Sequence, residues 1–382
     1  MIKSFTATTH EIDDAQAAVA EIKATLDLDN RLLKNSLGII SCFSEFGESG
    51  VLKAICDALP FECIGATTCL CAGGREMDQI FFVITVLTSD DCSFRAAHIN
   101  TAEKYEESAQ SVMSGLLDHP DGKPALLLTY FPLIQTMSGD MMLAAIDRAA
   151  GGIPLFGAMA IDHKLDYSTS GTIYNGKLFR ESVIMGAIYG NPKFTLEVAS
   201  FFENRIMSQK AIITESNGNI LMGVNGKTPR EYFNEFGMTE NELSVGMGFI
   251  PLVVDHDDGT KPIARAVFTI TPEGYAVCGG VMPVNKTLTL ARIDRDDVTD
   301  TTESILKPLI TKDSGLLSYS CLARYLALGI NNRAEAEKVI DIAGDSPFIF
   351  AYTGGEICPL PDADGKLKNY FHNYTNVFCL LS

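Results

Sequence analysis

The apolar and polar positions of the chain follow the same order three times. The first stretch has an apolar run at residues 36–42, apolar residues at helical spacing over 49–59, and further apolar runs up to residue 87. The same order recurs over residues 125–188 and 315–381. Short apolar runs bounded by glycine or proline are typical of buried strands, whereas apolar residues three and four positions apart are typical of helices. The pattern therefore predicts a recurring unit of strand, helix, strand and hairpin.

Turn-forming dipeptides mark the hairpins of the second and third units. Asn175-Gly176 and Asp364-Gly365 each separate two strand-like runs, and such pairs are strong signals for two-residue hairpin turns. The second strand of each unit also carries a glycine, and we expect these glycines to correspond: Gly65, Gly157 and Gly354. Because parallel strands joined through a helix need a crossover connection, the unit predicts mixed sheets.

Further elements are predicted outside the three units. Apolar residues at helical spacing predict helices over residues 15–26 and 105–116. Between the second and third units, turn residues predict hairpins over 211–226 and 264–281. A short helix is expected directly after Thr228, a residue type that favours helix N-caps.

The length and a polar stretch predict two domains. A chain of 382 residues exceeds what one ordinary core needs, and the polar residues 203–210 are typical of a boundary. We therefore expect domains over residues 1–205 and 206–382. The predicted fold class is α+β, with mixed β-sheets of the two domains packed together and helices on the outer faces.

Composition and charge narrow the classes of partner. The chain has 48 acidic and 30 basic residues, a net charge of −18, and no cluster of lysine and arginine, which argues against nucleic acid and anionic membranes as partners. The longest apolar run, Ile80–Leu87, is far shorter than the roughly 20 residues of a membrane-spanning helix, so no membrane insertion is expected. The first residues lack an apolar signal segment, so we expect a cytoplasmic protein whose ten cysteines are thiols.

The sequence contains no motif typical of a common cofactor or metal site. Residues 255–259 lack the spacing of a calcium-binding loop, and Cys69 and Cys71 have no second cysteine pair at zinc spacing. Phosphate-binding glycine loops and a serine nucleophile motif are also absent. We therefore expect no cofactor and no metal.

Candidate chemistry concentrates near the end of the chain. Cys321 follows a predicted strand and precedes Arg324 by three residues, so a cation would lie near the thiol, and His372 would supply a base if the two segments meet. The alternative is a buried cysteine that packs as a small apolar side chain. No third group that would orient the pair is identifiable, so Cys321 is a candidate nucleophile only and no catalytic residue is assigned.

Two arginines and a glutamate indicate recognition of a charged ligand. Arg265 lies in an apolar strand, where a guanidinium favours a carboxylate or phosphate partner, and Glu356 would pair with such an arginine or with a ligand ammonium. The alternatives for Arg265 are an exposed strand face and an internal pair with another acid. Gly354 and Gly355 would let backbone N–H groups approach a ligand, or would only form a turn.

Several motifs, in order along the chain, carry a family resemblance: Cys63–Thr68, Pro154–Ala160, Asn217–Phe233, Arg265, Ser318–Tyr325, Gly354–Pro359 and Phe371–Thr375. The chain resembles FIST proteins (F-box and intracellular signal transduction), which have an N-terminal and a C-terminal FIST domain. It departs from the family at residues 69–77, where the first domain usually continues into a short Gly-Glu step. The resemblance implies a sensory or interaction module that binds small ligands, amino acids among them, and acts through a signalling partner.

The residues and the resemblance together predict a free-standing small-ligand sensing protein rather than an enzyme. Its pocket is expected in the second domain, formed by Arg265, Ser320, Cys321, Arg324, Gly354, Gly355, Glu356, His372 and Asn373. Two other classes stay open. One is a cysteine-dependent enzyme that uses Cys321 on a reactive or thioester-like substrate, and the other is an interaction scaffold without a small ligand.

Overall fold

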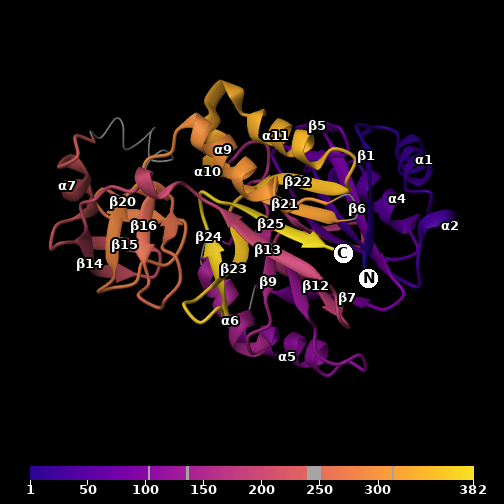
Figure 1. The fold of residues 1–382 in the computed structure, drawn as a ribbon, viewed down its shortest axis with the longest axis horizontal. Coiled ribbons are helices and arrows are strands. Elements are labelled where there is room, and N and C mark those ends of the chain that lie inside the picture. Colours follow the sequence, from indigo (N-terminus) through magenta and orange to yellow (C-terminus); the bar gives the residue numbers. More distant parts are fainter. Residues whose placement is uncertain (102–103, 135–136, 239–250, 312–313) are drawn as a thin grey trace.

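The described residues form three six-stranded sheets and one seven-stranded sheet, with helices around them (Figure 1). The structure is a computed structural model that describes residues 1–101, 104–134, 137–238, 251–311 and 314–382. In each six-stranded sheet two neighbouring strands are parallel and the remaining pairs are antiparallel. The mixed sheets confirm the predicted α+β class.

The first two units follow each other directly in the chain. The first consists of β1 (Lys3–Thr9), α1 (Ala15–Leu26), α2 (Leu28–Arg31), β2 (Asn35–Cys42), α3 (Glu45–Glu48), α4 (Val51–Asp57), β3 (Glu62–Thr67), β4 (Cys71–Gly73), β5 (Glu76–Asp78) and β6 (Phe82–Ser89). The second consists of β7 (Ser93–Asn100), α5 (Tyr105–Leu117), β8 (Leu126–Phe131), α6 (Gly139–Ala150), β9 (Leu155–Met159), β10 (Thr172–Tyr174), β11 (Lys177–Phe179) and β12 (Ser182–Tyr189). The predicted helices and the hairpin turn at Asn175-Gly176 are confirmed.

The third unit is interrupted after its first strand. It consists of β13 (Phe194–Ala199), then α9 (Arg295–Leu306), β21 (Gly315–Cys321), α10 (Leu322–Leu328), η3 (Gly329–Asn331), α11 (Ala334–Ala343), β22 (Phe348–Thr353), β23 (Glu356–Pro361), β24 (Leu367–His372) and β25 (Asn376–Leu381). The inserted segment contains η1 (Glu203–Arg205), β14 (Ala211–Asn217), β15 (Ile220–Val224), α7 (Pro229–Asn234), β16 (Leu252–Asp255), β17 (Ile263–Arg265), β18 (Val267–Ile270), β19 (Ala276–Cys278) and β20 (Thr287–Leu290). Its strands form the seven-stranded sheet, at the left of Figure 1.

Capping side chains set the ends of several helices. Ser138 accepts a hydrogen bond from the backbone of Met141 at the start of α6, and Gly151 ends that helix at a φ of +65°. Thr228 and Glu231 form a capping box at the start of α7, as the sequence around Thr228 predicts.

Each unit donates its hairpin to the sheet of another unit. The β4–β5 hairpin of the first unit pairs with β22 of the third. The β10–β11 hairpin of the second pairs with β3 of the first, and the β23–β24 hairpin of the third pairs with β9 of the second. The three units therefore form a closed ring in which each six-stranded sheet contains a hairpin from a neighbouring unit. The domain division near residue 205 stays a prediction, since two of the sheets take strands from both sides of it.

The register corrects one expected correspondence. Gly65 lies opposite Ile40 and Gly157 lies opposite Thr129, and the matching position of the third unit is Ala351, not Gly354. A Cβ atom would lie 1.9 Å from the carbonyl oxygen of Ile40 at Gly65 and 1.8 Å from that of Thr129 at Gly157. The first two units therefore need glycine for close approach of backbones, whereas the third does not.

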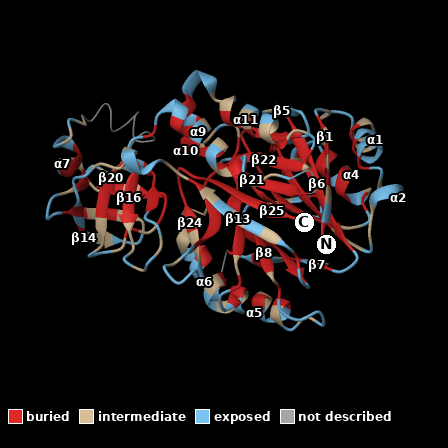
Figure 2. Ribbon diagram, viewed as in Figure 1, coloured by how far each residue is buried: buried red, intermediate tan, exposed pale blue. Residues whose placement is uncertain are grey.

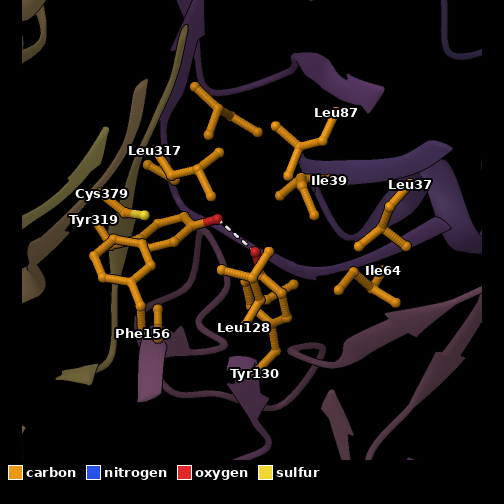
Figure 3. Packing of buried hydrophobic residues seen from close by; sticks show 14 of the residues in the cluster. Leu37, Ile39, Ile64, Leu87, Leu128, Tyr130, Phe156, Leu317, Tyr319 and Cys379 are labelled. Carbon is orange, nitrogen blue, oxygen red and sulfur yellow. Dashed lines mark hydrogen bonds between the residues drawn. The ribbon is translucent and has the colours of Figure 1, made fainter. Parts of the chain in front are cut away.

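Packing separates an inner core from outer ones. The inner core lies between the three sheets, where the hydroxyls of Tyr130 and Tyr319 are 2.7 Å apart (Figure 3). Outer cores lie under α1 and α4, under α5 and α6, and under α9 to α11, one on each six-stranded sheet, and the seven-stranded sheet has a core of its own. The central strands are accordingly buried while the helices show exposed faces (Figure 2).

Two predictions from composition can be compared with the structure. All ten cysteines are buried free thiols, as expected. Within the described ranges, none of the helices combines the length and the apolar content that crossing a bilayer requires.

Candidate functional site

Ser320 and Arg324 belong to a buried ion-pair network. The guanidinium of Arg324 donates to Oε1 of Glu335 from Nε (3.0 Å) and Nη2 (2.8 Å), and neither side chain is exposed. The hydroxyl of Ser320 donates to Oε2 of the same carboxylate (2.7 Å). A fully desolvated pair of this kind needs every polar atom satisfied.

Backbone carbonyls complete the surroundings of Arg324. Its guanidinium also donates to the carbonyl oxygens of Val298 (2.7 Å) and Ser200 (3.0 Å) and to the hydroxyl of Thr301 (3.1 Å). The network thus connects β21, α9, α11 and the end of β13. Arg324 has a structural partner in Glu335 and does not reach an open space.

Arg265 is held in a second, separate ion pair. It is fully buried, and its Nη2 donates to Oδ1 of Asp140 (2.9 Å) while Nη1 donates to the carbonyl oxygen of Phe371 (2.7 Å). The second oxygen of Asp140 accepts from the backbone of Val281 (2.9 Å). The internal pair with an acid, one of the two alternatives from the sequence, is what the structure shows. The partner is Asp140 rather than Glu356.

Glu356 lies in the interior without an ion-pair partner among the described residues. Its two carboxyl oxygens accept from the hydroxyls of Thr353 and Thr375, both at 2.8 Å. Burial raises the pKa of the Glu356 carboxyl well above its usual range, and the two hydrogen bonds oppose that effect only in part.

The glycines and Cys321 surround this buried carboxyl group. A Cβ atom at Gly354 would lie 2.8 Å from the ring of Tyr167, and one at Gly355, whose φ is +152°, would lie 2.2 Å from the ring of Phe371. The N–H of Gly354 donates to the carbonyl oxygen of Met159 (2.9 Å), so it is engaged within the protein. Both glycines therefore allow close packing within the ring of three units.

The environment of Cys321 does not activate a thiol. Burial raises the pKa of the Cys321 thiol, and the neighbouring Glu356 carboxyl raises it further. The cation of Arg324 acts in the opposite direction but does not outweigh burial.

An open cavity of about 480 Å³ lies beside these networks, where the insertion joins the third unit. We call it the junction cavity. Its apolar lining includes Val198, Phe201, Ile263, Ile305 and Leu360. Its polar lining includes Ser200, Thr301, Ser304, His372 and Thr375, with Glu203 and Lys261 as charged residues. Its size and mostly apolar walls are those of a small-molecule site.

His372 is the one predicted pocket residue that lines the junction cavity. Its Nε2 lies 2.7 Å from the carbonyl oxygen of Cys358, which can only accept, so Nε2 carries the proton. Burial, with the nearby cation of Arg265, lowers the pKa of His372 to about 4 and keeps the ring neutral near pH 7. Asn373 lies behind it, where its Oδ1 accepts from the backbone of Ala266 (3.1 Å).

The structure thus separates residues that the sequence grouped into one pocket. Arg324 reaches the junction cavity only through Ser200 and Thr301, which accept its hydrogen bonds and line the wall. Sequence reasoning missed Glu335, although its spacing from Val339 places it on the apolar face of a predicted helix. Lys261 carries no local signal that would identify it.

Fold and cavity together define an α+β protein with a preformed space for a small molecule. The chain belongs to the FIST family: the FIST N domain matches residues 36–227 and the FIST C domain matches residues 230–359. FIST domains are sensory domains of signal transduction, so the resemblance seen in the sequence is confirmed and supports a sensory role.

Comparison with other proteins adds little to this assignment. No curated protein sequence matches the chain. One of the similar solved structures is a cyanuric acid hydrolase from A. caulinodans, 8% identical, with 100% of this chain and 99% of that chain covered and a TM-score of 0.40. At this level of similarity the comparison carries no argument about function.

Proposed function

We propose that the protein is a small-ligand sensor that binds amino acids or related small carboxylates in the junction cavity. The observation that carries the proposal is the cavity itself, whose volume of about 480 Å³ falls within the roughly 300–1,000 Å³ of typical ligand sites. Apolar walls with few polar groups suit a ligand that has an apolar body and a charged end.

Charged residues of the lining support a ligand of this class. Lys261 and Glu203 are both exposed and both line the cavity, so a cation is present for a carboxylate and an anion for an ammonium group. The carboxylate-binding role that the sequence suggested for Arg265 passes in this proposal to Lys261, and Glu203 adds negative charge that attracts an ammonium-bearing ligand to the cavity.

The contacts behind the cavity wall support a sensing role. Ser200 and Thr301 line the cavity and also accept hydrogen bonds from Arg324, so a ligand that moves this wall acts on a buried network. We further propose that the response passes to a signalling protein, and that the protein works in the cytoplasm, where ten unpaired thiols are stable.

A thermal-shift screen tests the proposal. An external dye is needed because the chain contains no tryptophan. A ligand at a hundred times its dissociation constant adds about 2.7 kcal/mol to the free energy of unfolding, which gives a clear shift. We expect hits among amino acids and small carboxylates. The hits should disappear in Ile305→Trp, which fills the cavity, and persist in Ile330→Trp, at a position that is 92% exposed.

The two other classes give different outcomes. A screen without any hit, together with stable binding of a protein partner, would favour the scaffold. A cysteine-dependent enzyme would lose turnover in Cys321→Ser, but the raised pKa of that thiol gives this class no specific support.

A further inference from the structure

We infer that the junction cavity selects ligands through an amine: its inner polar surface accepts hydrogen bonds, so the group recognised there is a donor. This inference rests on the proposed function and adds which end of the ligand enters the cavity. It makes His372 and Thr375 specificity-determining residues.

His372 presents an acceptor to the cavity. Its Nε2–H is committed to the carbonyl oxygen of Cys358 at 2.7 Å, and the ring is neutral, so Nδ1 carries a lone pair. Nδ1 makes no hydrogen bond within the described part of the chain, although the side chain is only 2% exposed and lines the cavity. An acceptor that lines the cavity and has no partner in the described part of the protein is available to a donor that occupies the cavity.

Thr375 presents a second acceptor. Its hydroxyl donates to Oε2 of Glu356 at 2.8 Å, so the hydroxyl oxygen can still accept, and the residue lines the cavity.

Two other hydroxyls of the lining also donate inward. Thr301 donates to the carbonyl oxygen of Asp297 (2.6 Å), and Ser304 donates to that of Thr301 (2.9 Å). Three hydroxyls of the described lining, those of Thr301, Ser304 and Thr375, thus give their protons to the protein.

An ammonium group fits this surface better than the other donors. It has three donors and no acceptor, whereas a hydroxyl presents lone pairs of its own. A carboxylate has acceptors only, and it would face the lone pairs of His372 and Thr375. Lys261, the exposed cation of the lining, suits a carboxylate at the rim instead.

Matched ligands separate this inference from the proposed function. Leucine, 3-methylbutylamine and 4-methylpentanoate share one apolar body. Leucine carries both charged groups, 3-methylbutylamine only the amine, and 4-methylpentanoate only the carboxylate. Phenylalanine, phenethylamine and 3-phenylpropanoate form a second such set. Titration calorimetry at pH 7 should show the two amine-bearing members of a set binding at least tenfold more tightly than the carboxylate alone.

Variants of the lining assign the effect to residues. His372→Gln retains a donor for Cys358 but moves the acceptor, so it should weaken amine binding at least tenfold. Thr375→Val should also weaken amine binding at least tenfold. If Thr375→Val does not fold, His372→Gln alone tests the inference. Lys261→Gln should instead weaken leucine and leave 3-methylbutylamine unchanged. His256→Gln, outside the lining, is the matched control.

The outcomes are distinguishable. If 4-methylpentanoate binds as tightly as leucine, or if His372→Gln leaves amine affinity unchanged, the inference is overturned while the proposed function stands. If none of the six compounds binds, the proposed function is overturned for this ligand class, and the inference is overturned with it.

Discussion

Replacing Glu335 by glutamine tests whether the Arg324 network stabilises the third unit. The substitution keeps the shape of the side chain but removes the one charge that, among the described residues, pairs with the fully buried guanidinium of Arg324. Ser320 can rotate its hydroxyl to accept from the new amide, whereas Arg324 has no acceptor and cannot adapt. Removing one partner of a buried pair typically costs about 3–5 kcal/mol. We expect a loss of this size from a total free energy of unfolding of roughly 5–15 kcal/mol.

Urea unfolding followed by far-UV circular dichroism measures this loss. The matched control is Glu106→Gln, whose partner Arg148 and own side chain are 62% and 77% exposed, and which should leave the free energy of unfolding nearly unchanged. A loss below about 1 kcal/mol in Glu335→Gln would refute the reasoning, because it would mean that Arg324 is not desolvated or finds another counter-charge.

Three further predictions concern pH and close packing. His372 has a folded-state pKa of about 4, below its unfolded value near 6.5, so the free energy of unfolding should fall by about 3 kcal/mol as the pH drops from 6.5 to 4, and His372→Gln should remove this fall in urea titrations. Glu356 has a raised pKa in the folded state, so its contribution to the free energy of unfolding is complete below the unfolded-state pKa near 4.3 and is lost as the pH rises through the folded-state pKa. Glu356→Gln should therefore be more stable, relative to the parent, at pH 9 than at pH 4, and equal pH profiles of the two proteins would contradict this. Gly157→Ala places a Cβ 1.8 Å from the carbonyl oxygen of Thr129 and should cost at least 1–3 kcal/mol in the same assay, whereas Gly115→Ala, in open space within α5, should stabilise slightly.

Local signals in the sequence account for most elements of the fold. Helix α1 covers the predicted residues 15–26, and the turn at Asn175-Gly176 lies where the dipeptide indicated. These features depend on spacing within a dozen residues. The exchange of hairpins between units depends on pairings such as that of Ala351 with Cys71, which are 280 positions apart, and no local pattern specifies them.

The candidate site was harder to predict for a related reason. The sequence indicated that buried arginines need acidic partners, but 48 acids offer no means of choosing Glu335 and Asp140. The glycines beside Glu356 are typical of a ligand-binding turn, whereas in the structure Gly354 and Gly355 lie against the rings of Tyr167 and Phe371. Part of the cluster of unusual residues near the end of the chain therefore serves close packing of the interior.

The junction cavity lies where a ligand can act on the arrangement of the fold. Its lining comes from the end of β13, from the insertion at residues 261–264, from α9 and from the last hairpin. Each of these segments belongs either to the ring of units or to the inserted sheet, and the cavity lies between them. A ligand that fills the cavity contacts both bodies, so it must favour the relative placement that fits it best. Under the proposed function, ligand occupancy is therefore linked to how the inserted sheet is placed against the ring of units.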